Sequence, residues 1–241
     1  MDRLVSRALA VAAMTVAASA TAAPVIWVDW TSGIAGPSGS AAGAIDLGPL
    51  GVDPSDIGVS YSGEISFIQT AGGTDYWTGP NTTYQSAAVD NRPGTPDIIA
   101  LSSATAKTLT FSKAVDNLFF AVVSLNGNGY EFNEDFTIES FGLGYWGNGT
   151  LTKQDMGNGK FRLIGSGEPH GVIRFNHAVS SITWSSLTNE NWNGFTVGTY
   201  GLATEQPPPP PSTDVPEPGS LALLALGLGA LAASRRRPTI G

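Results

Sequence analysis

The stretch Leu118-Phe119-Phe120-Ala121-Val122-Val123 is apolar at every position and would therefore be apolar on both faces of a strand. Phenylalanine and valine favour strands, because their side chains pack well on a pleated surface. A strand that is apolar on both faces is typical of the interior of a sheet with both sides covered. The stretch predicts a central strand that is buried on both faces.

Short runs of β-branched and aromatic residues lie on both sides of this stretch. They are residues 25–30, 57–69 and 108–111 before it, and residues 135–139, 161–163, 172–175, 181–184 and 195–197 after it. The turn signals among them are Asn126-Gly127, Asn128-Gly129, Asn148-Gly149, Asn158-Gly159 and Asn193-Gly194. Asn-Gly pairs tolerate the positive φ angles that tight hairpin turns require. No segment has a convincing helical period. Together these features predict an all-β fold, an antiparallel β-sandwich that is jelly-roll-like.

The composition excludes several classes of site. The chain has 241 residues, no cysteine and a formal net charge of −8. Without cysteine it has no disulfides, no thiolate zinc site and no cysteine nucleophile. Nucleic acid is not expected as a partner, because phosphate binding needs a basic surface.

The N-terminus has the order of features of a secretory signal peptide. Arg3 and Arg7 are followed by an apolar run at residues 9–18 and then by small residues. This order predicts a signal peptide at residues 1–22 with cleavage after Ala22. The export translocon and signal peptidase are the partners that such a segment implies.

The remaining chain divides into three parts. Residues 23–205 form the predicted β-sandwich domain. Residues 206–214 form a linker with five consecutive prolines, which favour an extended polyproline II rod. Residues 215–241 form a tail with its own order of features.

The tail begins with Val215, Pro216, Glu217 and Pro218, continues with an apolar run at residues 221–233, and ends in basic residues. The basic residues are Arg235, Arg236 and Arg237. A helix over residues 219–234 would be about 24 Å long at ~1.5 Å per residue. The hydrocarbon core of a bilayer is ~30 Å thick, so the predicted transmembrane helix is short but workable with snorkelling arginines. The arginines should stay cytoplasmic, which places the upstream chain outside.

This tail resembles the PEP-CTERM sorting signal of Gram-negative bacteria, which combines a Pro-Glu-Pro motif, an apolar helix and terminal arginines in that order. The resemblance covers roughly the last tenth of the chain. It implies an exosortase as partner, an inner-membrane-anchored precursor, and later cleavage or transfer to the cell surface or its polysaccharide. The same tail occurs on some ice-binding proteins, so it does not define the activity of the body.

Aromatic residues in Gly/Asn-rich loops are the candidate saccharide contacts, because exposed indole and phenol faces stack on sugar rings. These candidates are Tyr76, Trp77, Tyr145, Trp146 and Trp192. Burial in the core is the alternative for each. It is the default for Trp27, Trp30 and Trp184, which lie within predicted strands.

One oxygen-rich loop is a candidate calcium site. Its candidate ligands are Asn126, Asn128, Glu131 and Asp135. Carboxylate, amide and carbonyl oxygens suit Ca²⁺, although the spacing does not fit an EF-hand. A plain acidic hairpin loop is the alternative, and no other cofactor is expected.

Catalytic motifs are weak in this sequence. The Gly-rich string at residues 142–147 matches a dinucleotide fingerprint, but a turn rather than a helix follows it. His170 and His177 flank a predicted strand, which would hold them too far apart to share a metal. No nucleophile elbow occurs.

The sequence favours the first of three functions, in which the protein is not an enzyme, and leaves two alternatives. The first is a non-catalytic surface or matrix module that contacts exopolysaccharide or other surface proteins. The second is a secreted hydrolase of matrix polysaccharide, which needs two suitably placed carboxylates. The third is an ice- or surface-binding protein, which needs a regular threonine array on one sheet face, whereas the threonines here are scattered along the sequence.

Overall fold

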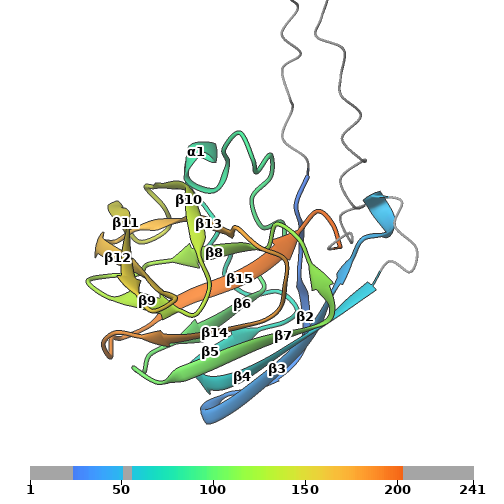
Figure 1. The fold of residues 1–241 in the computed structure, drawn as a ribbon, viewed down its shortest axis with the longest axis horizontal. Helices are drawn as coiled ribbons and strands as arrows, with labels where there is room; N and C mark the ends of the chain where they lie inside the picture. Colours follow the sequence, from blue (N-terminus) through green and yellow to red (C-terminus); the bar gives the residue numbers. More distant parts are fainter. Residues whose placement is uncertain (1–23, 51–55, 203–241) are drawn as a thin grey trace, which may run out of the picture. The chain divides into compact units, whose positions relative to one another are not determined.

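A computed structural model describes residues 24–50 and 56–202 of the chain. These residues form two antiparallel sheets that face each other across a common core (Figure 1). The helices among them are short: α1 (Asn81–Tyr84) and a 3₁₀ turn at Gly48–Leu50. The prediction of an all-β antiparallel fold is confirmed.

Within the described residues, sheet A has seven strands. Its order is β10 (Phe136–Gly142), β13 (His170–Phe175), β8 (Phe119–Val123), β15 (Asn193–Thr199), β6 (Ile98–Leu101) and β5 (Phe67–Gln69), and β1 (Ile26–Trp27) also pairs with β15.

Sheet B has eight strands among the same residues. Its order is β11 (Gly149–Gly157), β12 (Lys160–Gly167), β9 (Gly129–Phe132), β14 (Val179–Ser186), β7 (Ala106–Val115), β4 (Asp56–Ile65), β3 (Gly36–Asp46) and β2 (Asp29–Ile34).

Strand β8 is central and fully buried, as its apolar sequence predicts. It lies between β13 and β15, and all five of its residues are buried. Phe120 faces sheet B and stacks on Phe195, with ring centroids 4.8 Å apart and planes at 10°. Phe119 faces the opposite side, where it packs near Tyr200. Both faces of the strand are therefore covered by apolar side chains.

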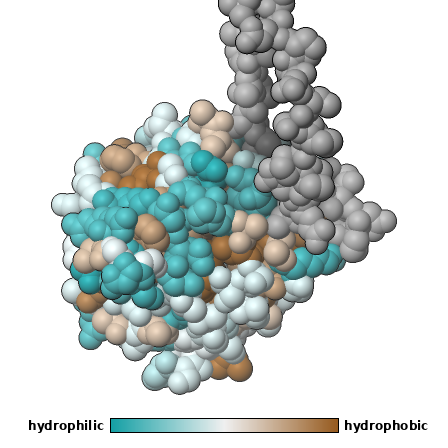
Figure 2. Space-filling model, in the orientation of Figure 1, coloured by the Kyte–Doolittle hydropathy of each residue, from teal (hydrophilic) through white to brown (hydrophobic). Residues whose placement is uncertain are grey.

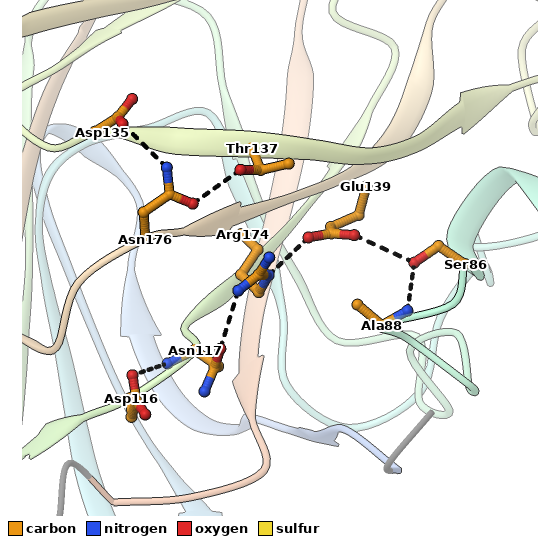
Figure 3. Close-up of polar contacts among 9 residues, drawn as sticks. All are labelled: Ser86, Ala88, Asp116, Asn117, Asp135, Thr137, Glu139, Arg174 and Asn176. Carbon is orange, nitrogen blue, oxygen red and sulfur yellow. Dashed lines mark hydrogen bonds and ion pairs between the residues drawn. The ribbon is translucent and has the colours of Figure 1, made fainter. Parts of the chain in front are cut away.

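A second apolar layer covers the outer face of sheet A. The long connection between β5 and β6, which includes α1, lies over this face (Figure 1). Trp77 and Tyr84 from this connection are buried in one cluster with Phe119. A polar bridge also holds the connection to the sheet: Arg174 donates to Glu139 at 2.6 Å, and Ser86 donates to the other oxygen of Glu139 (Figure 3).

The last eight strands pair as a nested set. β8 pairs with β15, β9 with β14, β10 with β13, and β11 with β12, so the second half of this segment returns along the first half. Except in the β11–β12 hairpin, consecutive strands belong to different sheets. Because the partners are antiparallel, the connections β8–β9, β10–β11, β12–β13 and β14–β15 all lie at one end of the sandwich.

The Asn-Gly turn signals have mixed outcomes. Asn158-Gly159 forms the β11–β12 hairpin turn, with φ angles of 51° and 70°. The prediction of a turn at Asn193-Gly194 is wrong, because both residues are buried at the start of β15. Gly194 is paired with Val123 there, and a Cβ atom on it would lie 2.4 Å from Ile98. The glycine at this position serves close packing rather than a turn.

Several predicted segments lie outside the described residues. They are the signal peptide at residues 1–22, the linker at residues 206–214 and the whole tail, including its sorting motif, its transmembrane helix and its arginines. In the part of the chain that the structure describes, no helix is both long and apolar enough to cross a membrane.

Candidate functional site

A cleft of about 330 Å³ opens at the end of the sandwich where the four connections meet. Each of these connections contributes to its wall, so residues far apart in the sequence come together here. The lining residues are Ser124, Asn126, Trp146, Glu168, Glu190, Asn191 and Trp192. The nested strand pairing is thus the direct cause of the site.

Four of the five aromatic residues singled out in the sequence form one cluster at this cleft. Ring centroids are 4.9 Å apart between Tyr145 and Trp146, and 5.0 Å apart both between Tyr76 and Tyr145 and between Tyr76 and Trp192. Trp146 lies 6.2 Å from Trp192 and is 53% exposed. The rings meet edge to face, an arrangement that fixes them against one another.

The prediction that the fifth residue, Trp77, is a surface contact is wrong. Trp77 belongs to the β5–β6 connection, and its side chain is fully buried against the outer face of sheet A. The indole packs edge to face on Tyr84 at 5.6 Å, and its Nε1 donates to the carbonyl of Asp97 at 3.2 Å. Position in a polar loop did not imply exposure, because this loop packs on the outer face of sheet A. Of the three tryptophans expected in the core, Trp30 and Trp184 are buried and Trp27 is only partly buried.

The turn that presents Tyr145 and Trp146 is shaped by glycine. The amide of Gly144 donates to the carbonyl of Gly147 at 2.8 Å, which closes a tight turn with the two aromatic residues at its tip. Gly144 also lies directly against the ring of His170, and a Cβ atom there would be 2.2 Å from the ring. Strand β11 follows this turn, so the Gly-rich string lacks the helix that a dinucleotide site requires.

Two glutamates share the cleft with the aromatic cluster. Glu168 accepts hydrogen bonds from Ser124 and Asn126, and Glu190 accepts them from Asn193 and, at 3.0 Å, from Asn128. The pKa of Glu190 is raised to about 7, chiefly by burial and also by the charge of Glu168, while the hydrogen bond from Asn128 opposes the shift. Nothing in the local sequence marks either glutamate as a site residue, so neither was predicted.

The raised pKa of Glu190 predicts a pH-dependent stability difference. Between the usual pKa of 4.5 and about 7, the folded state holds the proton more often than the unfolded state. The free energy of unfolding contributed by this group therefore falls as the pH rises through that window. The glutamine of Glu190→Gln cannot ionise. The melting temperature of this variant, relative to that of the unmodified protein, should therefore increase from pH 5 to pH 8. Thermal melts across this range measure the difference.

Glu134→Gln is the matched control for this melt series, because Glu134 lies on the β9–β10 connection at the other end of the sandwich. Its melting temperature should follow that of the unmodified protein. A Glu190→Gln difference that stays constant from pH 5 to pH 8 would contradict the assignment.

The four calcium candidates are distributed over separate contacts. Asn126 and Asn128 lie at the cleft, whereas Asp135 lies at the opposite end of β9 and pairs with Lys153. Glu131 pairs with Arg162 at 2.7 Å. In the described residues, no group of three or more His, Cys, Asp and Glu side chains is arranged to hold a metal ion. Calcium therefore stays a prediction from composition.

The two histidines have different surroundings. His170 is fully buried, with its Nδ1 atom 3.1 Å from the hydroxyl of Tyr84. Burial lowers the pKa of His170 to about 4, so it is neutral near pH 7. His177 is exposed after β13, at the other end of that strand. Neither histidine lines the cleft.

The outer face of sheet B carries small uncharged side chains that are aligned across four strands. One row consists of Ala42, Ser60, Thr110 and Ser181, and the next row consists of Ser40, Ser62, Thr108 and Thr183. The surface over β3, β4 and β7 accordingly has near-neutral hydropathy (Figure 2). Residues that are scattered in the sequence are thus brought into register by strand pairing.

A protein-family model for the PEP-CTERM protein-sorting motif matches residues 214–237. The match includes the Pro-Glu-Pro residues and the three terminal arginines, so the resemblance drawn from the tail is confirmed. Comparison of the chain with curated proteins and with solved structures gives no match.

Proposed function

We propose, for a chain that carries a PEP-CTERM protein-sorting motif, that the body is a non-catalytic module that binds exopolysaccharide through its end cleft. The motif indicates an exosortase as processing partner and a protein that is exported, processed at the membrane and released to the surface or the exterior. The ligand and the absence of turnover are the new elements of this proposal.

The observation that carries the proposal is the aromatic cluster at the cleft. Trp146 and Tyr145 are 53% and 43% exposed, and both are braced by neighbouring rings rather than free to rotate. A rigid, exposed indole offers a flat apolar face to the C–H face of a sugar ring. Asn126, Asn191 and Ser124 place hydrogen-bonding groups beside that face. This combination suits weak, repeated contacts along a polysaccharide.

Loss of the two indoles should abolish most of the binding. Aromatic contacts are worth about 0.5–1.5 kcal/mol each, so Trp146→Ala with Trp192→Ala should weaken polysaccharide binding about tenfold. Affinity electrophoresis in gels that contain the producing strain's exopolysaccharide measures this retardation. Phe141→Ala is the matched control, because Phe141 is 44% exposed but does not line the cleft. Equal retardation of the double variant and the control would remove the cleft from the proposal.

A secreted hydrolase is the second candidate, and one observation favours it. The cleft holds two carboxyl groups, and a pKa of about 7 suits Glu190 to act as a general acid near neutral pH. Release of shortened saccharides during the binding assay, lost in Glu190→Gln, would establish this candidate against the non-catalytic one.

The aligned face of sheet B favours the third candidate, a binder of ice or another flat surface. Neighbouring residues within a row are about 4.8 Å apart, and the two rows are about 6.6 Å apart along the strands. An ice-recrystallisation assay with the same secreted protein separates this candidate from polysaccharide binding.

The remaining features of the precursor belong to the same proposal. Export through the translocon is followed by signal-peptide cleavage after Ala22, and the transmembrane helix of the tail holds the precursor until the exosortase acts. Other surface proteins are further candidate partners, and the nested pairing of β8 to β15 supports a jelly-roll-like classification. Intact-mass measurement of the surface form tests both cuts.

A further inference from the structure

The end cleft combines two carboxyl groups with two indole rings, and none of the lysines or arginines in residues 24–50 and 56–202 lines it. We infer that this cleft selects saccharide residues that carry a protonated amine, such as a hexosamine without its N-acetyl group. The inference rests on the proposed function and adds the chemical class of the ligand.

The two glutamates of the cleft have neutral side-chain partners among the described residues. The side-chain donors to Glu168 and Glu190 are a serine hydroxyl and asparagine amides, which are all neutral. Four ion pairs of the described residues involve other acids: Asp75, Glu131, Asp135 and Glu139. A cation that enters the cleft would therefore meet two acids that lack a cationic partner there, whereas an acidic sugar would be repelled.

The indole rings add a second source of selectivity for the same ligand. The face of a tryptophan attracts cations and also stacks on the C–H face of a sugar. Trp146 and Trp192 line the same cleft as the two glutamates, so one hexosamine residue could place its ring on an indole and its ammonium group near a carboxylate. A lysine side chain would satisfy the carboxylates but would leave the flat indole face without a matching ring. The geometry thus favours an amino sugar over a basic peptide.

Burial of Glu190 is consistent with this use. Its pKa is raised by burial and by Glu168, so its ionised form lacks a compensating positive charge in the free protein. A bound ammonium group would supply that charge and would favour the ionised form. The structure therefore contains an acidic group whose unfavourable environment a cationic ligand would relieve.

The test compares two trisaccharides that differ only at nitrogen. One is the glucosamine trisaccharide with free amines, and the other is its fully N-acetylated form, both at pH 6, where the free amines are protonated. Tryptophan fluorescence titration follows binding, because Trp146 is exposed in the cleft. We expect the free-amine form to bind about tenfold more tightly, since ion-pair and cation–π contacts at partly exposed sites are each modest.

The variant Glu168→Gln with Glu190→Gln keeps the size of both side chains and one acceptor oxygen on each, but neither side chain can ionise. It should bind both trisaccharides equally, and thermal melts confirm that it is folded. Glu134→Gln, the same change outside the cleft, should keep the preference for the free amine.

The outcomes separate this inference from the proposed function. Equal binding of the two trisaccharides by the unmodified protein overturns the inference and leaves polysaccharide binding standing. A preference that persists in the double glutamine variant also overturns it. Binding of Nα-acetyl-lysine amide as tightly as the free-amine trisaccharide overturns it in favour of a basic peptide. Failure to bind either trisaccharide or the native exopolysaccharide overturns the proposed function itself.

Discussion

Phe120→Ala is expected to lower the free energy of unfolding of the body by about 3–5 kcal/mol, the usual cost of truncating a fully buried phenylalanine. Phe120 is 0% exposed, stacks on Phe195, and contacts Phe132 and Trp184 edge to face at 5.6 Å and 5.5 Å. These rings come from both sheets, so the cavity would open at the interface that holds the sandwich together. Denaturant or thermal unfolding followed by circular dichroism measures the loss.

Phe141→Ala provides the reference for this measurement. Phe141 is 44% exposed on β10, and substitutions at exposed positions usually change stability by less than ~0.5 kcal/mol. Phe119→Ala should also be costly, because Phe119 is fully buried beneath the second apolar layer. If Phe120→Ala unfolded at the same denaturant concentration as Phe141→Ala, β8 would not be the core strand described.

Trp77→Ala and Trp146→Ala should have opposite effects on stability and binding. Trp77 is fully buried and hydrogen-bonded, so its truncation should cost about 3–5 kcal/mol while leaving the cleft residues in place. Trp146 is 53% exposed, so its truncation should cost less than about 1 kcal/mol of stability but should weaken saccharide binding. Thermal melts and affinity electrophoresis on both variants measure the two quantities.

This pair also tests the corrected position of Trp77. Binding is compared at a temperature at which both variants remain folded. Weak retardation of Trp77→Ala with an unchanged melting temperature would restore Trp77 as a surface contact. It would also contradict the burial of Trp77 against the outer face of sheet A.

Much of the fold follows from local sequence, because buried strands need β-branched and aromatic residues. The segments around β4, β7, β8, β13 and β14 are predicted correctly for this reason. Strand β3 is not predicted from the sequence, because its many Gly, Ala and Ser residues are typical of a loop. Its extended conformation is imposed by pairing with β4 from Asp46 to Gly36, which is a long-range effect. Strand β9 is missed because its oxygen-rich surroundings resemble a binding loop.

The candidate site was predictable only in part. The exposure of Trp146 follows from a Gly-rich turn, which local sequence reveals. Glu168 and Glu190 lie in one cleft only because the β12–β13 and β14–β15 connections are at the same end of the sandwich. The same topology separates Asn126 from Asp135, although a short loop and a short strand are all that divide them in sequence. Spacing along a chain cannot report such convergence or separation before the strand order is known.

The position of β15 constrains the order in which this protein can fold. It is the last strand among the described residues, yet it lies inside sheet A between β8 and β6. A chain that is exported N-terminus first delivers β8 well before β15 arrives to cover its open edge. Sheet A therefore cannot close until residue 199 is available, and the Pro-rich stretch and the sorting motif follow it in the sequence. Sheet A can thus be completed only after nearly all of the body has emerged, and a chain that ends before β15 would leave β8 with an unpaired, apolar strand edge.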